Sequence, residues 1–170
     1  MSQSGPHGGE VWQFVAQSED DTERLGIALA DALRPGSIVA LVGPLGAGKT
    51  RLVKAVAAHL GIERRDVSSP TFVLIHEYAG TLPIYHFDAY RLRDTDEFLE
   101  LGAEELIDSQ GVCLIEWADR VDAVLPPDRL TITIEAAGPQ TRRFELNSGG
   151  SASRELLQTT RDAMLAGPGA

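Results

Sequence analysis

The chain has 170 residues, of which 43% are hydrophobic, and this length and composition suit one globular domain with a sizeable core. Its 15 Lys and Arg residues stand against 25 Asp and Glu residues, and the resulting net charge of −10 excludes a broad basic face for direct nucleic-acid binding. No apolar run approaches the roughly 18 residues of a membrane span, and no signal-peptide core follows Met1, so a cytoplasmic location is expected.

Composition divides the chain into three parts. Residues 1–9 are polar, rich in Gly and Ser and without periodicity, which predicts a disordered leader. Residues 10–147 carry every motif discussed below and are predicted to form a single folded domain. Residues 148–170 are predicted to be a C-terminal tail with a possible short helix that begins near Arg154. No internal repeat is visible.

The first predicted elements of the domain are a strand and a helix. Apolar residues at 11–15 predict a short strand. Ser18–Glu23 is dense in residues that begin helices, with Asp20 and Glu23 spaced like a capping box. An apolar face at helical spacing follows, and Pro35-Gly36 ends the helix. This face consists of Leu25, Ala28, Leu29, Ala32 and Leu33.

The strongest motif is a phosphate-binding loop between a strand and a helix. An unbroken apolar run at 38–42 predicts a buried parallel strand, and apolar residues at helical spacing from Leu52 to Leu60 predict a helix that Gly61 ends. Between them the chain fits G-x-x-x-x-G-K-[ST]. Glycines allow such a loop to turn sharply and to point backbone N–H groups at phosphate. The loop consists of Gly43, Pro44, Leu45, Gly46, Ala47, Gly48, Lys49 and Thr50.

This loop predicts a nucleoside triphosphate ligand together with Mg²⁺. Lys49 is expected to reach the β- and γ-phosphates, and the hydroxyl of Thr50 is expected to ligate the metal. The alternative is a glycine-rich turn without chemical consequence. The combination of strand, spacing, Lys-Thr pair and helix argues against that alternative.

A polar loop and a β-hairpin are predicted next. Ser69-Pro70-Thr71 is rigid and carries hydroxyls, so it is either a nucleotide-sensing switch loop or an ordinary proline turn. β-Branched and aromatic residues at 72–78 and 82–88 predict the two strands of the hairpin. Alternation places His86 and Asp88 on the same face. A hydrogen-bonded structural role for His86 is favoured over a catalytic one.

The second half of the domain supplies further strands. A helix that opens at Asp94 precedes a short apolar strand at 112–115. Cys113, within this strand, is the only cysteine, and it is predicted to be a buried hydrophobic residue of a reducing compartment rather than a catalytic thiol. Alternating segments at 130–134 and 141–146 predict an antiparallel pair. The order of elements predicts an α/β class, a single-domain P-loop NTPase fold whose mixed parallel and antiparallel sheet is flanked by helices.

Two acidic residues end predicted strands and are candidates for the magnesium-associated carboxylate. Glu116 follows the apolar run at 112–115 in the Walker B pattern, and Asp88 ends the second strand of the hairpin. Either alone could be a cap or a surface charge. Two strands that each end in a carboxylate near one phosphate-binding loop instead predict a catalytic site. In it a water molecule is held for hydrolysis or phosphoryl transfer.

Three further residues stay open between roles. Trp117 is a core residue by default, with a stacking platform or a partner anchor as alternatives. Arg91 and Arg93 either stabilise transferred phosphate charge, as an arginine finger does, or pair with the acidic residues at 94–97. Such arginines more often form exposed ion pairs with acidic side chains.

Taken together, the motifs resemble the TsaE (YjeE) family of bacterial P-loop ATPases. They follow the family's order, and the similarity covers roughly residues 11–146. Pro44 stands where an acidic residue is common, and Asp119 stands where Glu is frequent, but neither change removes a required donor. The matching blocks are Gly43–Thr50, Ser69–Phe72 with Glu77-Tyr78, His86–Leu92 and Glu116–Arg120.

The resemblance implies an ATP- and Mg²⁺-dependent ATPase that is needed to make N6-threonylcarbamoyladenosine (t6A) in tRNA. It also implies partners, a TsaB–TsaD heterodimer in which TsaD transfers the threonylcarbamoyl group while the ATPase permits multiple turnover. The chain would then meet tRNA only through this complex. Neither membrane binding nor independent nucleic-acid binding is expected, in agreement with the acidic composition.

The resemblance also assigns roles by position. Lys49 would serve the phosphates, Thr50 and Glu116 would hold Mg²⁺, and Asp88 would join Glu116 and Lys49 as a catalytic residue. The first switch would include Thr71 and the second Trp117. The set expected to contact nucleotide consists of Gly43–Thr50, Thr71 and Trp117.

Two other classes of function are kept open. A stand-alone P-loop kinase of a small metabolite also suits this length, although no clear second substrate site is visible. A nucleotide-dependent binding module, whose hydrolysis is incidental, is the third possibility. The absence of an N-K-x-D motif gives no sign of guanine recognition.

Overall fold

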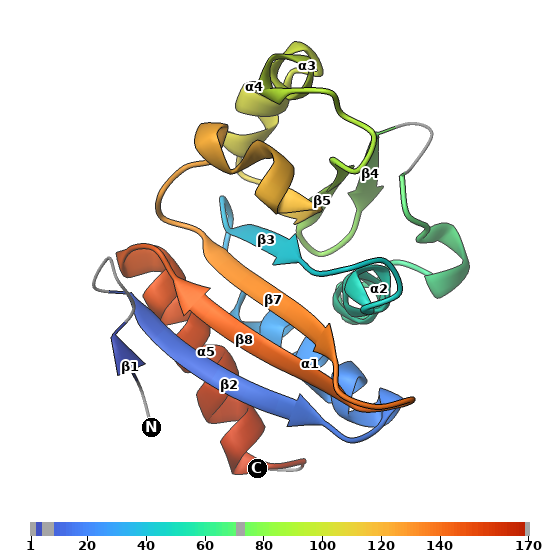
Figure 1. Cartoon of the computed structure of the whole chain (residues 1–170), viewed down its shortest axis with the longest axis vertical. Coiled ribbons are helices and arrows are strands. Elements are labelled where there is room, and N and C mark those ends of the chain that lie inside the picture. The colour runs from blue at the N-terminus through green and yellow to red at the C-terminus, as the bar shows by residue number, and fades with distance from the viewer. Residues whose placement is uncertain (1–2, 5–8, 71–73, 169–170) are drawn as a thin grey trace.

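A single mixed β-sheet organises the chain (Figure 1). The computed structural model describes residues 3–4, 9–70 and 74–168. The strands are β1 Gln3–Ser4, β2 Glu10–Ala16, β3 Ile38–Val42, β4 Ile75–Ala79, β5 Pro83–Asp88, β6 Val112–Glu116, β7 Leu130–Ala136 and β8 Arg142–Ser148. Their order across the sheet is β1-β2-β8-β7-β3-β6-β5-β4. The neighbours β7, β3, β6 and β5 run parallel, and antiparallel strands extend both ends, so the predicted mixed sheet is confirmed.

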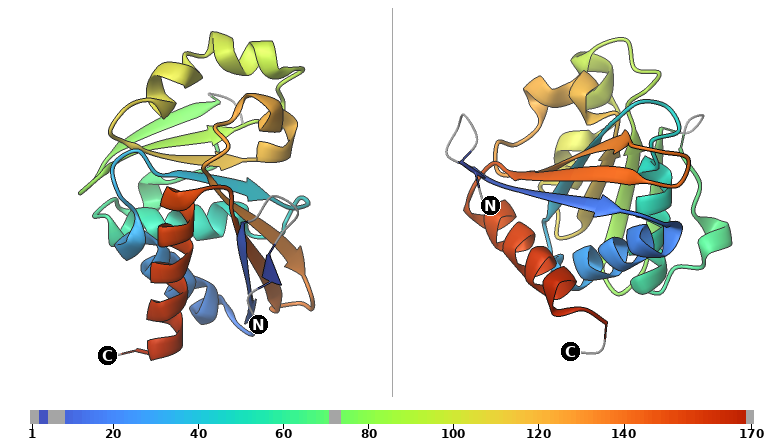
Figure 2. Two further views of the ribbon diagram at one scale, coloured as in Figure 1. Left: turned by 90° about the vertical axis from the view of Figure 1, so that its left-hand side faces the viewer. Right: turned by 60° about the horizontal axis from the view of Figure 1, so that its bottom comes forward.

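Helices cover both faces of this sheet (Figure 2). They are α1 Glu19–Ala32, α2 Lys49–His59, α3 Thr95–Glu100, α4 Ala103–Ile107 and α5 Ser151–Ala166, with 3₁₀ segments η1 Arg64–Asp66 and η2 Ala118–Val124. Leu52 of α2 and Leu156 of α5 share one buried cluster with Leu41 of β3. Phe98 of α3 packs with Ile115 of β6 in a second cluster on the opposite face. None of the helices in the described part of the chain is long and apolar enough to cross a membrane.

The interior strand β6 is buried along its whole length. It lies between the parallel strands β3 and β5, with helices over both faces, which explains its unbroken apolar run. Cys113 within it is 1% exposed, and burial raises the pKa of its thiol to about 12. A thiol with so high a pKa yields little thiolate at neutral pH. The predicted burial of this cysteine is therefore confirmed.

The start of α1 differs from the prediction. Ser18, not Asp20, is the N-cap residue, and its side chain accepts a hydrogen bond from the backbone N–H of Asp21. The carboxylate of Asp21 in turn accepts from the backbone N–H of Gln17 at 2.9 Å. The expected pairing of Asp20 with Glu23 is thus wrong, because the contacts that cap the helix are made by Ser18 and Asp21, each two residues earlier.

The predicted hairpin between β4 and β5 is confirmed within the described residues. Ile84 joins the cluster beneath α1, α2 and α5, whereas Phe87 joins the opposite cluster, as the alternation predicts. The first strand begins later than expected. Residues 71–73 lie outside the described part of the chain, and Leu74 has a left-handed backbone with φ of 72°. β4 therefore starts at Ile75.

The last two strands pair as predicted, and β7 makes an additional contact that the sequence analysis did not include. β7 and β8 are antiparallel, but β7 also runs parallel to β3, with Val42 opposite Thr133. The carboxyl ends of β3 and β7 therefore reach the same edge of the sheet. This arrangement brings the turn between β7 and β8 beside the phosphate-binding loop.

The segment after residue 147 contains a long, well-packed helix. α5 begins at Ser151, earlier than the helix predicted near Arg154. Its N-terminus is capped from the loop before β7, because the carboxylate of Asp128 accepts from the backbone N–H groups of Ala152 and Ser153 at 3.0 and 2.9 Å. A cap from so far along the chain leaves no local signal. α5 buries Leu156, Leu157, Thr160 and Met164.

Replacing Asp128 with Ala is expected to lower the free energy of unfolding by about 1 kcal/mol, the usual worth of an N-cap. Burial tends to raise the pKa of Asp128, but hydrogen bonds from Ser153 and Ala152 and the charge of Arg154 bring it below its ordinary value. Stability from this carboxylate is therefore present above the unfolded pKa of about 3.9 and is lost as pH falls through the lower folded pKa. Urea denaturation at a series of pH values measures both effects.

Asp162→Ala is the control for Asp128→Ala. The Asp162 side chain is 71% exposed and forms an ion pair with Arg161 at 3.3 Å. Its loss is expected to change stability by less than about 0.5 kcal/mol. Equal, small effects of the two substitutions would contradict the capping role of Asp128.

Candidate functional site

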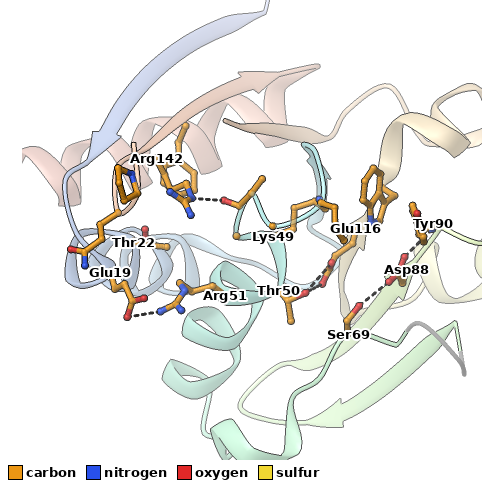
Figure 3. Close-up of a pocket in the computed structure, with 18 residues that line it drawn as sticks. Glu19, Thr22, Lys49, Thr50, Arg51, Ser69, Asp88, Tyr90, Glu116 and Arg142 are labelled. Atoms are coloured by element: carbon orange, nitrogen blue, oxygen red, sulfur yellow. Dashed lines mark hydrogen bonds and ion pairs between the residues drawn. The ribbon is translucent and has the colours of Figure 1, made fainter. Parts of the chain in front are cut away.

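A cavity of about 480 Å³ lies at the carboxyl ends of the parallel strands, around the first turn of α2 (Figure 3). Its volume is in the range of small-molecule binding sites, and its position is where α/β sheets bind ligands. It is lined by Glu19, Thr22, Leu45, Gly46, Ala47, Gly48, Lys49, Thr50, Arg51, Ser69, Asp88, Tyr90, Glu116, Trp117, Pro139, Gln140, Arg142 and Phe144.

The loop between β3 and α2 needs its glycines for two physical reasons. Gly46 and Gly48 have φ of 78° and 109°, in the left-handed region that other residues rarely adopt. Gly43 has no room for a side chain, because a Cβ there would lie 2.5 Å from the carbonyl oxygen of Ile134. The loop leads directly into the N-terminus of α2. Unpaired backbone N–H groups and the helix dipole at this position favour the binding of an anion.

Lys49 is the first residue of α2 and is only 4% exposed. Its ammonium donates hydrogen bonds to the carbonyl oxygens of Gly43 and Pro44 at 2.6 and 2.9 Å, and it lies 4.0 Å from the centroid of the Trp117 ring. Burial lowers the pKa of Lys49. The charges of the Glu116 and Asp88 carboxylates raise it, but the effect of burial is larger. The side chain thus brings a largely desolvated positive charge to the loop.

Thr50 and Glu116 meet at the end of β6. The Thr50 hydroxyl donates to the Glu116 carboxylate, with distances of 2.8 Å to Oε1 and 3.0 Å to Oε2. Because its hydrogen points to the carboxylate, the lone pairs of the hydroxyl are left for a cation. Hydroxyl and carboxylate oxygens are the ligands that Mg²⁺ prefers, so these residues fit a magnesium ion that takes its other ligands from phosphate and water.

No group of three or more His, Cys, Asp or Glu side chains that could hold a metal alone is found within residues 9–70 and 74–168. This agrees with the usual magnesium site of nucleotide-binding proteins, in which the protein supplies only one or two ligands.

Asp88 lies beside Glu116 with its orientation fixed. The two residues are partners in the parallel pairing of β5 with β6, and both are 3% exposed. One carboxylate oxygen of Asp88 accepts from the Ser69 hydroxyl and the other from the backbone N–H of Tyr90, each at 2.8 Å. The carboxylate therefore faces the cavity in a defined position.

Trp117 follows Glu116 in a left-handed conformation with φ of 56°. Its ring lies against that of Tyr90, with a centroid distance of 4.7 Å, and the guanidinium of Arg120 lies 5.2 Å from the Tyr90 ring. Trp117 is partly buried against the second core cluster and also lines the cavity. It therefore combines the default core role with a position at the candidate site.

The structure brings most of the predicted site residues to this one cavity. Leu45–Thr50, Asp88, Glu116 and Trp117 line it, whereas Gly43 and Pro44 do not line it and contribute carbonyl oxygens to Lys49. Thr71 lies outside the described residues, and its predicted switch role stays a prediction.

The two candidate arginine fingers do not line the cavity. Arg93 is strongly exposed and pairs with Glu97 at 3.4 Å, so pairing with the acidic residues of α3 is the observed arrangement for this residue. Arg91 is also exposed and is absent from the cavity lining. His86 is fully buried and absent from the cavity lining, and the hydrogen bond that the sequence favours for it is made to Glu116.

The side of the cavity formed by α1 and the β7–β8 turn is not predicted by the sequence motifs. Arg142 has the most contacts there, since its guanidinium donates to the carbonyl oxygens of Ala47, Gly138 and Thr141, each at 3.0 Å. It thereby ties the turn to the phosphate-binding loop. The signal that would have found it is the parallel pairing of β7 with β3, which sequence patterns do not reveal. The other missed lining residues are Glu19, Thr22, Arg51, Tyr90, Pro139, Gln140 and Phe144.

Known proteins resemble this chain in sequence and in fold. The family described as "Threonylcarbamoyl adenosine biosynthesis protein TsaE" matches residues 16–144. A relative from Treponema pallidum (strain Nichols), named "tRNA threonylcarbamoyladenosine biosynthesis protein TsaE", is 42% identical over 130 residues, which are 76% of this chain and 96% of the relative. A relative of the same name from Bacillus subtilis (strain 168) is 42% identical over 148 residues, 86% of this chain and 90% of the relative.

A solved structure agrees with these sequence relationships. The crystal structure of Bacillus subtilis YdiB matches with a TM-score of 0.80 and 34% identity, over 92% of this chain and 97% of the other. The range matched by the family, residues 16–144, contains the positions of Lys49, Thr50, Asp88 and Glu116.

Substitution of Arg142 by Met, which keeps the aliphatic stem, is expected to lower the free energy of unfolding by about 1–3 kcal/mol, because three carbonyl oxygens lose a charged donor. Thermal and urea denaturation measure the change. Arg143→Met is the matched control, since Arg143 is the next residue, is 52% exposed and pairs with Glu135 at 3.5 Å. If Arg142→Met lowers the free energy of unfolding no more than Arg143→Met does, the guanidinium of Arg142 does not hold the turn in place.

Proposed function

The chain belongs to the TsaE family of threonylcarbamoyl adenosine biosynthesis proteins, and we propose that it binds and hydrolyses ATP to support t6A formation in tRNA. One observation carries the ATPase proposal. Lys49, Thr50, Asp88 and Glu116 come from three different elements, and all four side chains line the same cavity at the N-terminus of α2. Positive charge for phosphate and oxygen ligands for Mg²⁺ are therefore available side by side.

Hydrolysis in this site depends on positioning and charge. The backbone N–H groups at the start of α2 and the Lys49 ammonium bind the phosphates, and Thr50 with Glu116 holds Mg²⁺. When bound, Mg²⁺ neutralises charge that develops on the phosphate oxygens. Asp88 orients the attacking water and accepts its proton, and its contacts with Ser69 and Tyr90 keep it in position.

The proposal extends to partners. The chain carries a net charge of −10, which does not favour direct contact with the tRNA phosphate backbone. On the strength of the family membership, we place it in the cytoplasm with homologues of TsaB and TsaD, where TsaD transfers the threonylcarbamoyl group and ATP hydrolysis by this chain permits repeated turnover. The chain contacts tRNA only through that complex.

Reconstituted t6A synthesis with the TsaB and TsaD proteins, with and without this chain, tests the proposed function. Product formation over many turnovers is expected to need both this chain and hydrolysable ATP. Identical product in both arms would overturn the role in t6A formation. Transfer of phosphate to a small acceptor, in the absence of any partner, would favour the kinase alternative instead.

Asp88→Asn tests the hydrolytic step separately. The amide keeps an acceptor for the Tyr90 N–H but cannot take a proton from water, so kcat for phosphate release is expected to fall by about 100-fold. The dissociation constant for ATP should change by less than about threefold, because Lys49 and the loop remain. Asp96→Asn, an exposed carboxylate of α3 outside the cavity, is the control. Hydrolysis at the wild-type rate by Asp88→Asn would exclude this residue as the base.

A further inference from the structure

His86 is a buried histidine directly beneath the candidate magnesium site. It lies on β5 two residues before Asp88, so both side chains point to the face that α2 covers. The residue is 0% exposed, and its Nε2 lies 2.8 Å from Oε1 of Glu116. An ionised carboxylate only accepts hydrogen bonds, so the imidazole carries its hydrogen on Nε2 and donates it to Glu116.

Glu116 is therefore held by two donors from different elements. Oε1 accepts from His86 of β5 and from the Thr50 hydroxyl of α2, both at 2.8 Å. The second contact also fixes Thr50, because its hydrogen follows the carboxylate and its lone pairs then face the cavity. A rotation of Glu116 would disturb both oxygen ligands at once. The contact from His86 opposes that rotation.

Fold stability alone does not account for a histidine at this position. Its second ring nitrogen, Nδ1, is buried and has no hydrogen-bond partner among the described residues. An unpaired buried nitrogen costs stability, which an apolar side chain of similar volume would avoid. The nearest aromatic neighbours are His76 and Tyr78, with ring centroids 6.4 and 6.3 Å away, and these contacts need no histidine at residue 86.

We propose that His86 is a positioning residue for the magnesium site, which holds the Glu116 carboxylate, and through it the Thr50 hydroxyl, in the orientation that binds Mg²⁺. This inference rests on the proposed function, since it concerns the metal that accompanies ATP. His86 does not touch nucleotide or metal. Its effect is on the affinity for Mg²⁺ and not on the phosphate contacts of Lys49.

The test measures the dissociation constant of N-methylanthraniloyl-ATP in excess Mg²⁺ and in EDTA, for the wild type and for His86→Leu and His86→Gln. In EDTA all three proteins should bind within about twofold of one another, because Lys49 and the loop are intact. The gain in affinity from Mg²⁺ should be about 10-fold smaller in His86→Leu, in line with other contacts to metal-binding side chains. His86→Gln should keep the gain, because its amide nitrogen reaches the position of Nε2.

His76→Leu is the matched control, since the His76 ring lies edge-on to that of His86 and forms a hydrogen bond with Tyr78, and no contact between His76 and Glu116 is seen among the described residues. If His86→Leu does not fold, His86→Asn replaces it, because the shorter amide does not reach Glu116. An undiminished Mg²⁺ gain in the variant that lacks the donor, or an equal loss in His86→Gln, would overturn the proposal. A wild-type protein without Mg²⁺-dependent nucleotide binding would instead overturn the proposed function itself.

Discussion

Parallel pairing of β3, β6 and β5 is the constraint on which the rest of the site depends. Because parallel strands end at the same edge, the loop after β3, Glu116 after β6 and Asp88 at the end of β5 reach one place. Glu116 is in register with Leu41 on one side and with Asp88 on the other. α2 then starts over this edge and presents Lys49 and Thr50 to the two carboxylates. A shift in this register would separate the groups that the proposed chemistry needs.

The same pairing concentrates buried charge. Lys49, Asp88 and Glu116 are each less than 5% exposed, and such charges are costly unless each has partners. The carbonyl oxygens of the loop and the Trp117 ring receive Lys49, and hydroxyl, imidazole and backbone donors surround the carboxylates. The two carboxylates of a site built this way are held in position before a ligand arrives. Lys49 is different, because its ammonium must exchange the loop carbonyls for phosphate oxygens when a nucleotide binds.

Local patterns predicted much of this arrangement. The phosphate-binding loop, the apolar run before Glu116 and the β4–β5 hairpin are each contained in a short stretch, so sequence alone identified them. Contacts between distant segments were missed. Two hydrogen bonds illustrate this, the one that caps α5 through Asp128 and the one from Arg142 to the carbonyl of Ala47. Neither has a local sequence pattern, because each joins loops that come together only in the folded chain. The N-cap role of Ser18 in α1 was not predicted either, because several neighbouring acidic residues are equally suitable as N-caps.

A crystal structure with the non-hydrolysable analogue AMP-PNP and Mn²⁺, whose anomalous signal marks the metal, tests whether the cavity at the N-terminus of α2 binds nucleotide and metal. We expect the β- and γ-phosphates at the N-terminus of α2, with the Lys49 ammonium on phosphate oxygens rather than on the carbonyls of Gly43 and Pro44. We expect the Mn²⁺ peak beside the Thr50 hydroxyl and the Glu116 carboxylate. Nucleotide bound outside this cavity, or a metal peak away from Thr50 and Glu116, would show that the site has been assigned wrongly.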